Sequence, residues 1–348
     1  IMSIKKFSLM MTSVGGEMSA QTMTFAQKSQ RHDVRVVGVD ASEKATGKYF
    51  ADAFYTVPFA DDPSYISSVL NIVSNEAVQL ILPGSDEEAL MLAKHRELFE
   101  KQGCQVACPD YQTLEILANK AETYRAISKI EGLNVPVWKE VSDQNELLDA
   151  LDEVYVQCPH GIVLKPSVAR GGRDILIISD QYQEVETVPN ARELRMGLNT
   201  YKKDFTNFYE GKFPVVVMQR LAEPVHDIDM VSHDGRVIQV IPRRRVHSAA
   251  PNEGHILLND PQLIKMAEIV IKKFNLSWLQ DIDAMYDVDG TAYILEINPR
   301  PSGSFSISIA AGIPLLDDII SLAKGEETSQ RISPEEKHVI PYKMLKAV

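Results

Sequence analysis

Two extended segments near the C-terminal end, Trp278 to Tyr286 and Ala292 to Asn298, constrain the fold more than any other feature of this chain. Apolar and polar residues alternate along the second segment, as in a β-strand with one buried face. Asp289-Gly290 lies between the segments, and this dipeptide is a strong signal for a tight hairpin turn. The sequence therefore predicts an antiparallel two-stranded ribbon.

Four oxygen-rich side chains are expected on one face of this ribbon. A turn at Asp289-Gly290 would place Asp283 opposite Glu296 and Asp281 opposite Asn298. Like charges this close repel each other unless a cation lies between them. Because the ligands are oxygens, with few nitrogen or sulfur candidates nearby, Mg²⁺ or Mn²⁺ is favoured over zinc.

The alternative is a surface hairpin whose acidic face is only solvated. It is weakened because Glu296 lies within an apolar run, where an unpaired carboxylate would be costly. We therefore predict a metal site on this face of the ribbon. A metal held by few carboxylates usually completes its shell with water and nucleotide phosphates.

Basic residues and glycines that suit phosphate binding lie further upstream. Residues 161–178 read as a strand, a loop and a second strand, and Lys165 ends the first apolar run. In the loop, Gly171-Gly172 let the backbone approach an anion closely and Arg173 adds positive charge. Lys120 stands near the start of a predicted helix. Each feature alone fits an ordinary solvated loop or helix about equally well.

In their order and spacing these features resemble the ATP-grasp superfamily, in particular the ATP-binding halves of the carbamoyl phosphate synthetase large subunit and related carboxylate–amine ligases. The resemblance covers nearly the whole chain. It rests on Asn119-Lys120, Leu164-Lys165-Pro166-Ser167, Gly171-Gly172-Arg173, Val217-Met218-Gln219, Pro242-Arg243-Arg244-Arg245, Asp283 and Glu296-Ile297-Asn298-Pro299-Arg300.

The resemblance implies that ATP and Mg²⁺ (or Mn²⁺) bind this chain. Lys120 and Lys165 would contact phosphate oxygens. Ser167 to Arg173, with Gly171 and Gly172, would form a mobile lid loop over the β- and γ-phosphates. The implied metal ligands are Asp283, Glu296 and Asn298. Arg300 and Arg245 would stabilise the transferring phosphoryl group or hold an anionic substrate.

The hinge that would contact adenine, Val217 to Leu221, departs from the family pattern. Family members often carry an acid where Gln219 stands, although an amide oxygen can still accept a hydrogen bond from the adenine amino group. The main chain as far as Leu221 would contact the base. Glu223 and Asp227 are the candidates for the acid that binds ribose.

The implied reaction is ATP-dependent ligation of a carboxylate to an amine (or a thiol) through an acyl phosphate, with release of ADP and phosphate. The expected substrates are small molecules, an amino acid or a similar acid and an amine. One alternative is phosphorylation of bicarbonate or carbamate, as in carbamoyl phosphate synthesis. Another is a nucleotide-binding regulatory subunit without turnover.

The expected fold class is α/β. Apolar runs at Phe7 to Val14, Val34 to Val39 and Leu80 to Leu82, separated by helix-like segments, predict a Rossmann-like parallel sheet. Gly15-Gly16 and Asp40 would also suit an NAD-binding protein, but the three-glycine pattern is missing. We expect four parts: an N-terminal domain (1–113), a central helical linker (114–156), an ATP-grasp lid (157–216) and a catalytic subdomain (217–348).

Composition limits the partners and the compartment. A formal charge of −12 argues against a nucleic-acid-binding surface. No apolar stretch reaches membrane-spanning length, so we expect no membrane partner. The three cysteines form neither an even set nor a metal spacing, which suggests reduced thiols in a cytoplasmic protein. The resemblance also makes a homodimer possible.

Overall fold

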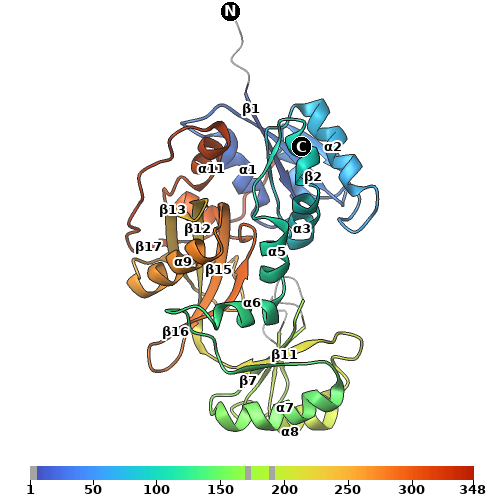
Figure 1. Cartoon of the computed structure of the whole chain (residues 1–348), viewed down its shortest axis with the longest axis vertical. Coiled ribbons are helices and arrows are strands. Elements are labelled where there is room, and N and C mark those ends of the chain that lie inside the picture. The colour runs from blue at the N-terminus through green and yellow to red at the C-terminus, as the bar shows by residue number, and fades with distance from the viewer. Residues whose placement is uncertain (1–5, 169–173, 188–192) are drawn as a thin grey trace, which may run out of the picture.

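The computed structural model describes residues 6–168, 174–187 and 193–348. It has three sheets arranged along the long axis, with the N-terminal domain at one end and the lid at the other (Figure 1). The catalytic sheet lies between them. The predicted α/β class and the Rossmann-like start of the chain are confirmed.

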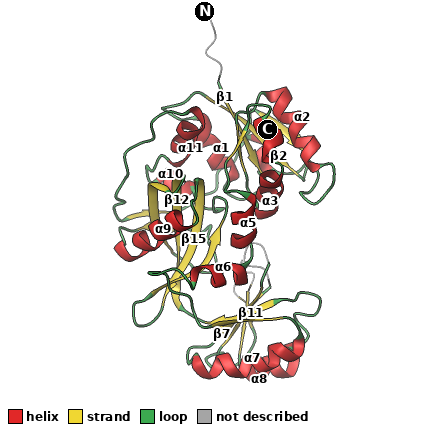
Figure 2. Cartoon of the chain, viewed as in Figure 1, coloured by secondary structure: helices red, strands yellow, loops and turns green. Residues whose placement is uncertain are grey.

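The N-terminal sheet is parallel, with strand order β3-β2-β1-β4-β5. Successive residues of β1 face opposite sides, since Leu9 and Met11 belong to one apolar cluster and Met10 to another. Helices cover both faces of this sheet (Figure 2). The elements are β1 Phe7–Thr12, α1 Ser19–Gln27, β2 Val34–Asp40, a 3₁₀ turn Thr46–Tyr49, β3 Ala53–Thr56, α2 Tyr65–Glu76, β4 Leu80–Leu82, α3 Asp86–Lys94, α4 Arg96–Glu100 and β5 Gln105–Val106.

Two short helices connect this domain to the lid. Asp110 caps α5, Tyr111–Leu117, and Asn119 caps α6, Lys120–Ile127, each by accepting a backbone N–H of the first turn. Tyr124 of α6 shares an apolar cluster with Met218 of the lid and with residues of the catalytic sheet. Helix α6 therefore joins the lid sheet to the catalytic sheet.

The lid sheet has six strands in the order β6-β11-β7-β8-β10-β9, with α7 and α8 along its outer side (Figures 1 and 2). Strand β6 and helix α7 lie within the expected linker, residues 114–156, yet join this sheet and its apolar cluster. We therefore propose that the lid begins near residue 138. Its elements are β6 Trp138–Val141, α7 Gln144–Gln157, β7 Ile162–Pro166, β8 Ile175–Ile178, β9 Glu186–Thr187, β10 Glu193–Met196, α8 Leu198–Thr200, a π-helical turn Tyr201–Phe205 and β11 Val215–Gln219.

The catalytic sheet has the order β16-β15-β12-β13-β14-β17, and every pairing in it is antiparallel. Helix α9 begins at Pro261, directly after the cap residue Asp260. The elements are β12 Ala222–His233, β13 Arg236–Arg245, β14 His255–Leu257, α9 Pro261–Lys273, β15 Trp278–Tyr286, β16 Ala292–Asn298, α10 Ser306–Ala310, α11 Leu315–Lys324 and β17 Lys337–Val339.

The cysteines and the helices of the described residues bear on the compartment and membrane expectations drawn from the sequence. The cysteines Cys104, Cys108 and Cys158 are all buried and form no disulfide. Within the described ranges, no helix combines the length and the apolar character needed to cross a bilayer.

Candidate active site

The predicted ribbon is β15 paired with β16, and its register at the acidic residues is confirmed. Asp283 lies opposite Glu296, and Asp281 lies opposite Asn298. The hairpin loop is longer than a two-residue turn, because Tyr286 pairs with Ala292 and the loop spans the five residues between them. A β-bulge next to Asp283 then shifts the register back by one residue.

The bulge also supplies a contact to the phosphate side of the site. Leu295 is the extra residue, and its carbonyl oxygen accepts a hydrogen bond of 2.6 Å from the Tyr124 hydroxyl. The same hydroxyl lies 3.3 Å from the Lys165 ammonium, which can donate to it. Tyr124 thus connects strand β16, which carries two of the predicted metal ligands, to one of the two predicted nucleotide lysines.

Both lysines lie beside the predicted metal ligand Glu296. The Lys120 Nζ atom is 3.1 Å from a carboxylate oxygen of Glu296. Lys165 is 6% exposed, and burial lowers its pKa although Glu296 and Asp283 oppose that shift. Burial alone would raise the pKa of Glu296, but Lys120 and Lys165 outweigh it and lower the value to about 2. Glu296 is therefore ionised at neutral pH.

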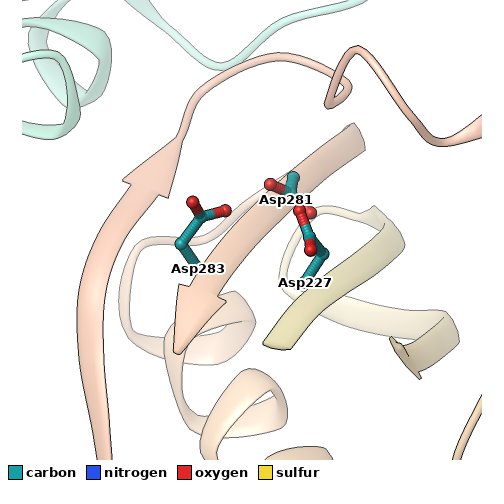
Figure 3. A group of neighbouring side chains, drawn as sticks. All are labelled: Asp227, Asp281 and Asp283. Atoms are coloured by element: carbon teal, nitrogen blue, oxygen red, sulfur yellow. The ribbon is translucent and has the colours of Figure 1, made fainter. Parts of the chain in front are cut away.

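The other side of Asp283 faces strand β12. Two Asp-Ile-Asp triplets, 227–229 and 281–283, pair antiparallel, so Asp227 lies opposite Asp283 and Asp229 opposite Asp281. One carboxylate oxygen each from Asp227, Asp281 and Asp283 lie within 4.8 Å of one another. Figure 3 shows these three carboxylates gathered over β12 and β15.

Two of the four arginines of β13, Arg243 and Arg245, point into this acidic region. Arg245 binds both carboxylate oxygens of Asp227, at 2.7 and 2.9 Å, and one oxygen of Asp283 at 2.8 Å. Arg243 is fully buried and binds Asp229 at 2.9 Å. Arg244, between them, is exposed.

The acids respond differently to these surroundings. Burial tends to raise the pKa of Asp227, but Arg245 outweighs it and the pKa falls well below the usual range. Burial raises the pKa of Asp283 to about 6, with Arg245 opposing and Asp227 and Glu296 adding to the rise. Burial and the neighbouring carboxylates also raise the pKa of Asp281. The carboxylates at the centre of the group therefore favour a bound cation or a proton.

The oxygen ligands of the predicted metal fit a hard divalent cation. Asp283 and Glu296 are directly opposed carboxylates, and such pairs are unfavourable without a cation. The Asn298 amide nitrogen donates to Asp281 at 3.1 Å, which fixes the orientation of its side chain. Carboxylate and amide oxygens are ligands that Mg²⁺ accepts, together with water and phosphate.

Arg300 lies just beyond these ligands but contacts the N-terminal domain. Its Nε atom is 2.9 Å from an oxygen of Asp86, the first residue of α3. Ser85 caps that helix by accepting a hydrogen bond from the Glu88 N–H. The ion pair brings the N-terminal domain to the edge of the site.

The hinge residues lie apart from the acidic group. The Gln219 amide oxygen accepts from the Val137 N–H at 3.2 Å, and its nitrogen donates to Asp287 at 3.0 Å. The Gln219 side chain therefore holds the hinge in place, and its amide oxygen already accepts a hydrogen bond from Val137. Leu221 is buried, and Glu223, at the start of β12, is 3.1 Å from Arg195.

Ser167 holds the start of the predicted lid loop. Its carbonyl oxygen accepts from the Lys120 N–H at 2.9 Å, and its hydroxyl donates to Glu140 at 2.7 Å. Gly171, Gly172 and Arg173 lie outside the described residues.

The dinucleotide alternative has little support in the N-terminal domain. The Asp40 carboxylate, which would mimic the acid of such a fold, accepts hydrogen bonds from the Gly15 and Ser42 N–H groups, each at 2.8 Å. Asp40 thus stabilises its own loop.

Sequence reasoning missed the involvement of strand β12. Asp227 was considered only as a ribose ligand, whereas it lies with Asp281 and Asp283. The repeated Asp-Ile-Asp triplet was the available signal, because two strands with identical alternation present their acids to one face.

Two family models match different parts of the chain. "ATP-grasp in the biosynthetic pathway with Ter operon" matches residues 212–346, and "PylC-like, N-terminal domain" matches residues 9–107. Among curated proteins, the carbamoyl phosphate synthase large chain of Thermoanaerobacter sp. (strain X514) is 25% identical over 286 residues, which cover 77% of this chain and 24% of that protein. The chain thus spans about a quarter of the length of the first such relatives.

Solved structures share the fold over most of the chain. N5-carboxyaminoimidazole synthetase from Staphylococcus aureus, complexed with ADP, superposes with a TM-score of 0.70 at 17% identity, covering 94% of this chain and 80% of that one. L-amino acid ligase from Bacillus licheniformis gives a TM-score of 0.62 at 15% identity, covering 92% and 74%. The ATP-grasp family model that matches residues 212–346, the two lysines beside Glu296, the opposed carboxylates and the shared fold together support the resemblance to the ATP-grasp superfamily.

Proposed function

We propose that this protein is an ATP- and Mg²⁺-dependent carboxylate–amine ligase that acts through an acyl phosphate. The observation that carries the proposal is the placement of Lys120 and Lys165 against Glu296, with Asp283 directly opposite. Phosphoryl transfer depends mainly on positioning and on neutralisation of phosphate charge by cations. The similarity in fold to an L-amino acid ligase supports an amino acid or a similar small acid as substrate.

Each group has a role in this proposal. Lys120 and Lys165 bind phosphate oxygens, and Asp283, Glu296 and Asn298 hold Mg²⁺ (or Mn²⁺). When bound, the metal neutralises charge on the β- and γ-phosphates. The start of the lid loop is held by Ser167, and the glycines and arginine that follow, Gly171, Gly172 and Arg173, cover the phosphates in this proposal.

The remaining residues bind the nucleoside and the substrate. The main chain from Gln219 to Leu221 contacts adenine, and Glu223 is the better candidate for ribose because both oxygens of Asp227 are bound by Arg245. Arg300 leaves Asp86 to hold the anionic substrate or the transferring phosphoryl group. Arg245 supports that region through Asp283. Homodimer formation and a cytoplasmic location stay predictions.

The test is ADP release by the purified chain with Mg²⁺ across a panel of amino acids paired with amines, with mass detection of products. A product whose mass equals the condensed pair, formed together with ADP, supports the ligase. Glu296→Gln should abolish turnover, whereas Asp289→Asn, an acid at the hairpin tip, should leave it unchanged. Full activity of the Glu296 variant would disprove the metal assignment.

The second candidate is phosphorylation of bicarbonate or carbamate. It is favoured by the match to carbamoyl phosphate synthase large chains, which this chain covers only in part. Bicarbonate-dependent ADP release without any amino acid would support it. Tight ATP binding with no ADP under all conditions would instead favour a regulatory subunit.

A further inference from the structure

Glu140 is an acidic residue of the lid sheet, on its edge strand β6, that the proposed function does not use. Val216 of the neighbouring strand β11 lies opposite Glu140 on one side and opposite Lys165 of β7 on the other. Residues directly opposite one another in a sheet point to the same face. The carboxylate of Glu140 is therefore on the same side of the lid sheet as the ammonium group of Lys165.

Both carboxylate oxygens of Glu140 are bound by the protein. Its Oε1 atom accepts a hydrogen bond of 2.7 Å from the Ser167 hydroxyl, and its Oε2 atom pairs with the guanidinium of Arg125 on α6. The side chain of Glu140 is only 17% exposed, and Ser167 is fully buried. Arg125 thereby neutralises a carboxylate that would otherwise repel phosphate on this side of the lid.

The same contacts hold helix α6 at two points. At its first residue, the Lys120 N–H donates to the Ser167 carbonyl oxygen at 2.9 Å. In its last turn, Arg125 binds Glu140. Because Ser167 also donates to Glu140, these contacts form a closed ring that begins and ends on α6. Ser167 follows Lys165 by two residues in the chain, so the ring fixes where Lys120 lies relative to Lys165.

We propose that Glu140 is a positioning residue that sets the spacing of Lys120 and Lys165 for the phosphates of ATP. The inference rests on the proposed function, in which both lysines bind phosphate oxygens. Glu140 acts through the Ser167 hydroxyl and through α6, without contacting the nucleotide itself. Donors that are already in place bind an anion without a cost of reorganisation, so a looser ring should weaken ATP binding.

The experiment is calorimetric binding of ATP with Mg²⁺ to the full chain and to three variants. Glu140→Leu should weaken binding about tenfold or more, the loss expected when one charge-assisted hydrogen bond to phosphate is misplaced. Glu140→Gln keeps an acceptor for the Ser167 hydroxyl and should recover most of that loss. The matched control is Glu153→Gln, which removes an exposed acid of the lid paired with Lys139, and it should bind ATP like the unmodified chain.

A double-mutant cycle with Lys120→Met distinguishes positioning from a general loss of structure. If Glu140 acts through Lys120, then Glu140→Leu should cause a much smaller loss of ATP affinity in the Lys120→Met chain than in the unmodified chain. A purely structural effect would add in full. If Glu140→Leu does not fold, Arg125→Met takes its place in the cycle, because it opens the same ring at a more exposed side chain.

The results separate this inference from the proposed function. Unchanged ATP affinity of a folded Glu140→Leu chain, or full additivity in the cycle, would overturn the positioning role alone. Failure of the unmodified chain to bind ATP would refute the proposed function and this inference with it.

Discussion

Arg243 is the largest fully buried side chain among the described residues, and its replacement by methionine should be strongly destabilising. The guanidinium binds Asp229 at 2.9 Å and also donates to the hydroxyls of Ser302 and Ser304, each at 3.1 Å. Methionine fills much of the volume but leaves the Asp229 carboxylate with the Ser308 hydroxyl as its remaining neutral donor. Removing one partner of a buried ion pair costs about 3–5 kcal/mol.

The interaction between Arg243 and Asp229 can be measured with a double-mutant cycle. In Asp229→Asn with Arg243→Met, the uncompensated buried charge is gone, so the double variant should be more stable than Arg243→Met alone. We expect a coupling free energy of about 1–3 kcal/mol from the double-mutant cycle. The cost would then reside mainly in the unpaired carboxylate.

The assay is urea unfolding followed by tryptophan fluorescence in a Trp138→Phe background, which leaves Trp278 of the catalytic sheet as the only tryptophan. This probe reports the sheet that contains the pair. A loss below about 1 kcal/mol for Arg243→Met, or strict additivity in the cycle, would refute the argument from the buried charge.

Three further predictions follow from the site. The pKa of Asp283 is raised to about 6, so protons compete with the metal for this carboxylate. Mg²⁺ affinity, measured by calorimetry in the presence of ATP, should therefore fall as the pH drops through about 6. Asp283→Asn should remove this pH dependence. Lys120→Met should weaken ATP binding about tenfold or more, because a charge-assisted hydrogen bond contributes about 1.5–3 kcal/mol, while the exposed Lys129→Met binds normally. Tyr124→Phe should lower the free energy of unfolding in urea by about 1–3 kcal/mol, since the Leu295 carbonyl loses its donor, and an unchanged value would mean that water replaces the hydroxyl.

The ribbon and its facing acids were predicted correctly from the sequence, although the predicted turn was too short. A two-residue turn at Asp289-Gly290 and the observed five-residue loop differ by one residue in register, and the bulge at Leu295 cancels the difference at Asp283. Local turn propensity could not predict the bulge, because it is stabilised by a distant hydroxyl on α6.

What could not be predicted depends on strands far apart in the sequence. The pairing of β12 with β15 brings Asp227 to Asp283 across 56 positions, and alternation alone does not tell which strands are neighbours. Likewise, the first strand of the lid, β6, pairs with β11 and not with a sequence neighbour. Arg245 was correctly expected in the site, but its partners Asp227 and Asp283 follow only from that sheet order.

The side-chain amide of Gln219 connects the lid sheet to the β15–β16 ribbon. It ties the end of lid strand β11 to Val137 on one side and to Asp287, in the loop that closes the β15–β16 ribbon, on the other. Rotation of the lid about this point would either break these hydrogen bonds or move the β15–β16 ribbon with the lid. Because Asp287 lies in the hairpin that carries Asp283 and Glu296, we expect a change in the angle of the lid sheet to act on the spacing of these two carboxylates.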